Sequence, residues 1–158
     1  MSISAICIDS REPTWIQTLN FGGVPTTVMM LDTGDLHVLC SDGNLLMIER
    51  KSPDDLLNSL RDERLLPQLA RLVQSRLDDQ SQGEIITHWP YLVIDGEITK
   101  GPEGKAMTSG RGLTGWNYSS VQGALLTIQE MGVCVVTCGD GEFEDCVVRL
   151  SKRERGII

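Results

Sequence analysis

Residues 43–55 read GNLLMIERKSPDD, an apolar run that ends in three consecutive charges, Glu49-Arg50-Lys51. The apolar part has the composition of a strand buried in a core. Another β-rich segment, residues 35–40, precedes it, and the intervening Ser41-Asp42-Gly43 is typical of a hairpin turn. The stretch therefore predicts a β-hairpin whose second strand leads out of the core into charged residues.

The length of the hairpin loop decides which charges meet. A two-residue loop would place Asp35 and Glu49 on opposite faces of the sheet, because side chains alternate along a strand. A three-residue loop, residues 41–43, would place Asp35 directly opposite Glu49, with Lys51 on the same face. That loop requires a left-handed third residue, and the third residue is Gly43. The sequence thus permits two carboxylates and a lysine to converge.

Convergence of the carboxylates of Asp35 and Glu49 is costly without a counterion. A divalent cation would compensate it, and hard oxygen ligands favour Mg²⁺ or Mn²⁺. A simpler interpretation is that Asp35 caps the mouth of the hairpin and residues 49–51 form a solvated strand end. The D…ExK spacing alone does not separate these alternatives.

Length and composition predict one domain over residues 1–158, with 41% hydrophobic and 23% charged residues. No apolar run reaches the length of a membrane span, and the N-terminus lacks the apolar region of a signal peptide, so we expect a cytoplasmic protein that does not contact membranes. Its five cysteines fit reduced core thiols. The net charge of −8 argues against a general polyanion binder. Nucleic-acid binding would require a few local cations, bound metal or a basic partner.

Strands alternate with helices along the rest of the chain, which favours an α/β fold with a mixed sheet covered on both faces. Residues 95–117 are expected to form a long irregular loop, of the kind that is usually functional or disordered. Further strands are predicted over residues 4–9, 24–31, 91–96 and 133–138, and helices within 12–20, 52–60, 63–77, 118–132 and 141–155.

Several short motifs occur in an order that resembles the XPF-type structure-specific endonuclease family. They are IDSRE (8–12), TGD (33–35), IERKSPDD (48–55) and RLLPQ (64–68). The family signature is G-D, a variable gap, E-R-K, three residues and D, and this chain matches it without departure. The resemblance implies a restriction-endonuclease-like fold, a central mixed β-sheet flanked by α-helices, with the active site at one edge.

The same resemblance implies a metal site. Asp35 and Glu49 would be metal ligands, and Asp9 a third ligand or a neighbouring group. Mg²⁺ or Mn²⁺ would polarise the scissile phosphate and activate a water. Lys51 would orient that water or stabilise charge on the phosphate, as an ammonium rather than a neutral base.

Other matched residues would support catalysis or bind DNA. Arg11 and Arg50 would hold phosphate bidentately or brace the carboxylates, and Glu12 belongs to the same opening motif. Lys105 and Arg111 are candidate phosphate contacts within the long loop.

Three further positions carry two interpretations each. Asp55 is either catalytic support or one of the acidic residues that favour the start of a helix after Ser52 and Pro53. Arg64 and Gln68 match the family pattern, but a helix-surface or salt-bridge role explains them equally well.

The predicted function is a metal-dependent DNA endonuclease acting on branched, flap or fork DNA. Alternatives are a non-catalytic DNA-binding or dimerisation subunit and a nuclease for plain duplex DNA. The presence of every signature residue favours activity, since inactive partners in the family typically lose them. No helix-hairpin-helix module is expected in these 158 residues, so a homodimer or a partner that carries such modules is a candidate source of DNA affinity.

Overall fold

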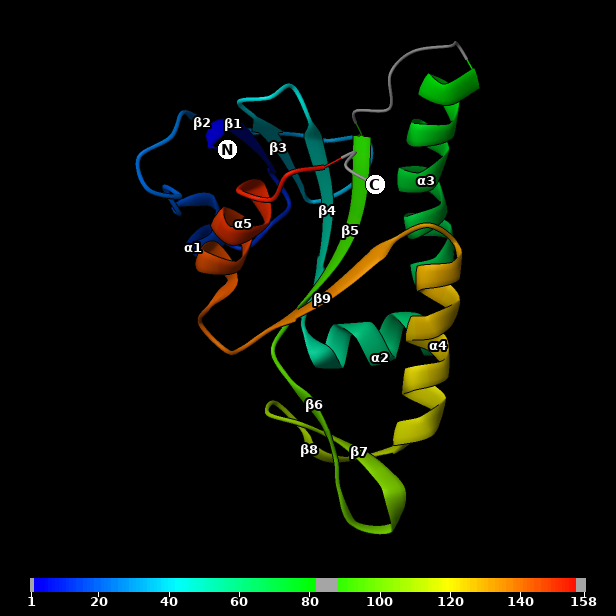
Figure 1. Cartoon of the computed structure of the whole chain (residues 1–158). Helices are drawn as coiled ribbons and strands as arrows, with labels where there is room; N and C mark the ends of the chain where they lie inside the picture. The colour runs from blue at the N-terminus through cyan, green and yellow to red at the C-terminus, as the bar shows by residue number, and fades with distance from the viewer. Residues whose placement is uncertain (1, 82–87, 156–158) are drawn as a thin grey trace.

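The computed structural model describes residues 2–81 and 88–155; residues 1, 82–87 and 156–158 of the predicted single domain lie outside it. Its centre is a six-stranded sheet in the order β2-β1-β3-β4-β5-β9 (Figure 1). β3 runs antiparallel to β1 and β4, and the other neighbours are parallel, so the sheet is mixed, as predicted. The strands are β1 (Ile3–Asp9), β2 (Thr26–Met29), β3 (Leu36–Cys40), β4 (Leu45–Lys51), β5 (His88–Asp95) and β9 (Cys134–Cys138).

Helices cover both faces of this sheet (Figure 1). On one face, α1 and α5 pack over a core that includes Ile16, Ile48 and Phe143. On the other, α2, α3 and α4 enclose a core that includes Met47 and Leu69. The expected α/β fold, a central mixed sheet flanked by helices, is confirmed. The helices are α1 (Thr14–Gln17), α2 (Pro53–Arg61), α3 (Leu65–Ser81), α4 (Tyr118–Glu130) and α5 (Phe143–Ser151), which ends four residues before the predicted limit.

The hairpin between β3 and β4 has a three-residue loop, residues 41–43, which is the alternative that Gly43 permits. The pairing of β3 with β4 runs from Leu36 opposite Ile48 to Leu39 opposite Leu45. Gly43 closes the loop with a φ of 89°. Continuing the register by one residue places Asp35 opposite Glu49, so the converging arrangement is the one the chain adopts.

Alternation along β4 separates its final charges. Met47 faces α3 and Ile48 faces α1 and α5, as their two core clusters show. By the same alternation, Glu49 and Lys51 point toward α3, and Arg50 points to the opposite face. The strand thus supplies charged side chains to both sides of the sheet at its carboxyl end.

Residues 95–117 are not the irregular loop predicted from the sequence. They contain a second, antiparallel sheet, which lies beyond α2 (Figure 1). Its strands are only three to six residues long and contain glycines and charges, so they carry no clear hydrophobic alternation. They are β6 (Ile98–Lys100), β7 (Lys105–Thr108) and β8 (Gly112–Asn117), with a 3₁₀ turn (Pro102–Gly104) before β7.

No helix in the described part of the chain has both the length and the apolar character that a membrane crossing demands.

Two glycines with positive φ give a test of the packing that surrounds the site. Gly96 follows β5 with a φ of 131°, and a Cβ there would lie 2.9 Å from Pro53 Cδ at the start of α2. Gly43 has no neighbour within 4 Å of its Cβ position. We expect Gly43→Ala to lower the free energy of unfolding by about 1–2 kcal/mol from backbone strain. Gly96→Ala should cost a further 1–3 kcal/mol, roughly, because the added methyl displaces α2.

Urea unfolding of both variants measures this difference. Equal losses of stability would contradict the close packing of Gly96 on α2.

Candidate active site

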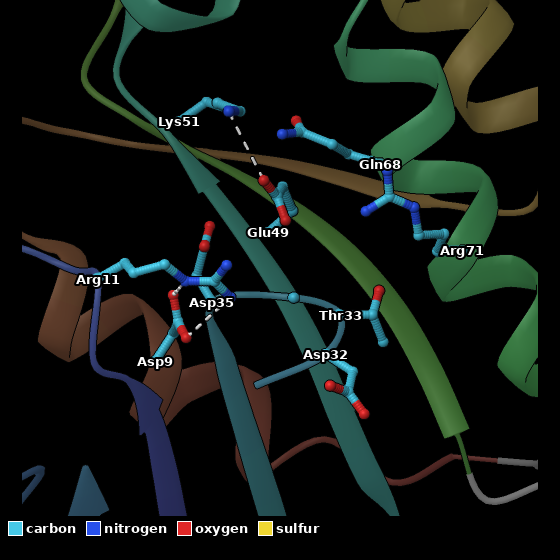
Figure 2. Close-up of a pocket in the computed structure, with 10 residues that line it drawn as sticks. Asp9, Arg11, Asp32, Thr33, Asp35, Glu49, Lys51, Gln68 and Arg71 are labelled. Carbon is cyan, nitrogen blue, oxygen red and sulfur yellow. Dashed lines mark hydrogen bonds and ion pairs between the residues drawn. The ribbon is translucent and has the colours of Figure 1, made fainter. Parts of the chain in front are cut away.

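A pocket of about 270 Å³ opens where β1 and β4 end, beside α3 (Figure 2). Three segments supply its walls: the end of β1 with the residues after it, the loop before β3, and the end of β4. Side chains of α3 face them across the pocket. The lining residues are Asp9, Arg11, Asp32, Thr33, Gly34, Asp35, Glu49, Lys51, Gln68 and Arg71. The pocket therefore gathers most of the predicted active-site residues.

Backbone hydrogen bonds hold Asp35 at the junction of β1, β3 and β4. The N–H of Asp9 donates to the carbonyl of Asp35 (2.8 Å), and the N–H of Asp35 donates to the carbonyl of Ile48 (2.7 Å). The side chain is also anchored, because its Oδ2 accepts from the N–H of Arg50 at 2.8 Å. These bonds keep the carboxylate beside the end of β4.

Asp35 and Glu49 share a buried, negatively charged environment. Burial, with repulsion from Glu49 and Glu12, raises the pKa of Asp35 to about 8, against the opposing effects of the Arg50 N–H and Lys51. Burial also raises the pKa of Glu49, although Lys51 lies 3.6 Å from its Oε1 and opposes the shift. One lysine is therefore not enough to keep both carboxyl groups ionised, and without a further cation the pair favours retaining a proton.

Asp9 differs from this pair because its charge is already neutralised. Its carboxylate accepts from Arg11 Nε (2.9 Å), from an Arg11 terminal nitrogen (3.1 Å) and from the N–H of Leu31 (3.0 Å). Burial by itself raises the pKa of Asp9, but the hydrogen bonds from Arg11 and Leu31 outweigh it and hold the pKa below its ordinary value. Asp9 thus lines the pocket as half of an ion pair (Figure 2).

The donor set bears on whether a divalent cation fits. Asp35 and Glu49 offer hard oxygen ligands whose mutual repulsion a cation would relieve, which suits Mg²⁺ or Mn²⁺. Across residues 2–81 and 88–155, however, no three His, Cys, Asp or Glu side chains are grouped closely enough to hold a metal. Asp9, predicted to be a third ligand or a neighbouring group, forms an ion pair with Arg11. The carboxylates of Asp35 and Glu49 therefore suit a cation, whereas Asp9, in its pair with Arg11, does not act as a third ligand in this structure.

Arg50 lies outside the pocket, on the α1 and α5 face. One terminal nitrogen donates to Glu12 at 2.8 Å and the other to Asp95 at 3.3 Å. The guanidinium carbon lies 5.6 Å and 5.9 Å from the ring centroids of Trp15 and Phe143. Of the two roles weighed for Arg50, the contacts match bracing of carboxylates rather than phosphate binding, and Glu12 belongs to this buried network.

The start of α2 explains Asp55 structurally. The hydroxyl of Ser52 accepts from the N–H of Asp55 at 3.2 Å, so Ser52 is the N-cap and Asp55 lies in the first turn. The exposed Asp55 side chain does not line the pocket. Its position matches the helix-start alternative.

Arg64 and Gln68 separate in the structure. Arg64 is exposed and pairs with Asp62 at 3.3 Å, away from the pocket. Gln68 lines the pocket, and its Oε1 is buried without a hydrogen-bond partner among the described residues. Gln68 is therefore the member of this motif that the fold brings to the site.

The two cations predicted to bind DNA from the long loop do not line the pocket. Lys105 donates to Asn117 Oδ1 at 2.9 Å within the second sheet. Arg111 donates to Asn58 Oδ1 of α2 at 3.3 Å, next to the bond from Thr108 to Asp54 (2.7 Å). Their contacts tie the second sheet together and fasten it to α2.

Three residues that line the pocket received no role from the sequence, although one of them, Thr33, lies within the quoted TGD motif. Asp32 and Thr33 directly precede the Gly-Asp motif, and the carbonyl of Thr33 is 2.8 Å from His37 Nε2, which steadies this loop. Arg71 lies three residues after Gln68, on the same face of α3 (Figure 2). That helical spacing was the available signal for Arg71.

Comparison with known proteins agrees with the geometry. The family model of the ERCC4 domain matches residues 8–152, whereas no curated protein matches significantly. The fold is similar to XPF from Aeropyrum pernix, with a TM-score of 0.62 and 20% identity over 95% of this chain and 66% of that chain. XPF from the same organism in complex with DNA gives a TM-score of 0.60 and 21% identity, covering 98% and 68%.

This chain spans about two thirds of the length of those structures. At 20–21% sequence identity, the similarity to these structures establishes the fold alone. Membership of a family rests on the family model, which matches most of the chain. The chain belongs to the ERCC4 domain family, which confirms the kinship with XPF-type structure-specific endonucleases expected from its motifs.

Proposed function

We propose that this protein is a divalent-metal-dependent DNA endonuclease that hydrolyses phosphodiesters in branched, flap or fork DNA. The observation that carries the proposal is the buried pair of Asp35 and Glu49, two carboxyl groups that face a pocket shared with Lys51 and whose full ionisation needs a further cation. Two buried carboxylates repel each other unless a cation lies between them. Groups with strongly shifted pKa values of this kind are concentrated at functional sites.

Each pocket residue has a chemical role in this proposal. Asp35 and Glu49 would hold Mg²⁺ or Mn²⁺, which when bound polarises the scissile phosphate and lowers the pKa of an attacking water. Lys51, held 3.6 Å from Glu49, stabilises negative charge that develops on the phosphate. The buried Gln68 oxygen lacks a partner in the described structure, and an attacking water can donate to it and be oriented.

Exposed cations at the pocket margin are suited to the DNA backbone. Arg11 and Arg71 both line the pocket and reach solvent, and guanidinium groups bind phosphate bidentately. The structural relative solved in complex with DNA supports DNA as the partner. Because the net charge is −8, we propose that a second copy or a helix-hairpin-helix-containing partner supplies further affinity.

Cleavage assays with labelled flap, fork, junction and plain duplex DNA test the activity. We expect cutting with Mg²⁺ or Mn²⁺ that EDTA abolishes, and a preference for substrates with a branch. Glu49→Ala should lower the rate by roughly a hundredfold or more, because it removes a metal ligand.

Arg149→Ala is a matched control, since Arg149 lies on α5 in an exposed pair with Asp145. Cleavage by Glu49→Ala at the rate of the wild type would overturn the active-site assignment. Absence of cleavage by folded wild-type protein on every substrate would instead favour a non-catalytic subunit.

The raised pKa of Asp35 predicts how stability depends on pH without metal. The folded state favours the protonated carboxyl, so its contribution is fully present below the ordinary aspartate pKa of about 4 and is lost as pH rises to about 8. We expect the free energy of unfolding, measured with urea in EDTA, to fall across this window. Asp35→Asn should flatten the decline, because the amide does not ionise.

Saturating Mn²⁺ should also remove the decline in the wild type, since the cation stabilises the ionised form. A decline in Asp35→Asn as steep as in the wild type would refute the buried-charge interpretation.

A further inference from the structure

We propose that Arg11 closes the metal site in the free protein and that a DNA phosphate opens it by drawing Arg11 away from Asp9. Metal binding and substrate binding would then be coupled through one side chain. This inference rests on the proposed function, because it concerns how the same site acquires its third carboxylate.

The ion pair between Arg11 and Asp9 is built from a buried and an exposed partner. The Asp9 side chain is 5% exposed, whereas the Arg11 side chain is 63% exposed. The Arg11 guanidinium donates one hydrogen bond to each carboxylate oxygen of Asp9 and a further one to the carbonyl of Leu31 at 2.7 Å. Figure 2 shows the Arg11 guanidinium against the Asp9 carboxylate, and the difference in exposure places Arg11 on the solvent side of the pair.

This arrangement opposes a cation in two ways. Both Asp9 oxygens already accept hydrogen bonds, one of them also from the N–H of Leu31. In addition, the positive guanidinium lies about 3 Å from those oxygens and would repel a divalent ion that approached them. Among the described contacts, no guanidinium group donates to the carboxylates of Asp35 and Glu49; the Arg50 contact to Asp35 comes from its backbone N–H. In the free protein the ligand set is therefore two carboxylates rather than three.

A phosphate can replace Asp9 as the partner of Arg11. Guanidinium binds phosphate through the same parallel N–H bonds that it uses with a carboxylate. Because most of the side chain is solvent-exposed, its rotation requires little repacking of the core. Release of Arg11 leaves Asp9 buried, charged and unpaired beside Asp35, whose carbonyl its own N–H already contacts. A cation is the partner that this position then favours.

The coupling is reciprocal by thermodynamic necessity. DNA that removes Arg11 from Asp9 raises the affinity for metal, and metal bound at Asp9 raises the affinity for DNA by the same factor. The full ligand set is then formed chiefly when a phosphodiester is present. The free enzyme consequently holds metal weakly.

Mn²⁺ affinity, measured by electron paramagnetic resonance without DNA, tests the closed state. We expect Arg11→Met to bind Mn²⁺ roughly tenfold or more tightly than the wild type, because Asp9 becomes available as a ligand. Arg71→Met is the matched control: it removes one positive charge from the same pocket but leaves the Asp9 pair intact. Its gain in affinity should be clearly smaller.

A second measurement adds a flap DNA that carries phosphorothioates, which resist hydrolysis. This DNA should raise the Mn²⁺ affinity of the wild type several-fold but change that of Arg11→Met little. Asp9→Asn should abolish the increase with DNA, because the amide does not supply the third carboxylate. Thermal unfolding of each variant verifies that it is folded.

The outcomes distinguish this inference from the proposed function. Equal gains in Mn²⁺ affinity in Arg11→Met and Arg71→Met would mean that only net charge matters, and would overturn the proposal that Arg11 closes the site. Weaker Mn²⁺ binding by Arg11→Met would mean that Arg11 orients Asp9 as a ligand, which also overturns it. If Glu49→Ala binds Mn²⁺ as well as the wild type under every condition, the metal site itself is wrong.

Discussion

The antiparallel register between β3 and β4 is the constraint on which the site depends. It places Asp35 opposite Glu49 at the buried end of the hairpin, where two like charges repel each other and lose hydration. A register shifted by one residue would turn the charges at the end of β4 to opposite faces. Gly43 secures the register, because a three-residue loop needs a left-handed residue at its third position.

The alternation of β4 divides its charges between two tasks. Glu49 and Lys51 face the pocket and α3, whereas Arg50 faces α1 and α5 and binds Glu12 and Asp95. The ion pair between Arg50 and Asp95 joins the carboxyl ends of β4 and β5. Removing either partner would leave a buried charge without compensation, so the pair stabilises this end of the sheet. The consecutive E-R-K residues thus combine a reactive face with a structural one. Arg11 adds a third element, an exposed cation that neutralises Asp9 at the opening of the site.

Much of the fold and site could be predicted from local patterns. Alternating strands and helices indicated the mixed sheet, and the ordered motifs identified the family and placed Asp35, Glu49 and Lys51 together. Sequence patterns report only on residues that are near one another in the chain, and this limit explains which features could not be predicted. The strands of residues 95–117 are too short for a hydrophobic period. Helical spacing places Arg71 on the same face as Gln68, but that this face borders the pocket follows from the packing of α3 beside β4. The pairing of Arg50 with Asp95 joins residues 45 positions apart.

The sequence by itself determined most elements of the central sheet and its helices, because these follow from side-chain periodicity. It also permitted the three-residue hairpin loop and the set of carboxylates that can meet, through the glycine at one turn position. Only the tertiary structure decided which charges are neutralised. Asp9 is paired and Asp35 is not, although both are aspartates at strand ends in one pocket. The physical reason is that burial and the direction of neighbouring cations set the cost of each charge, and both arise from packing between distant segments.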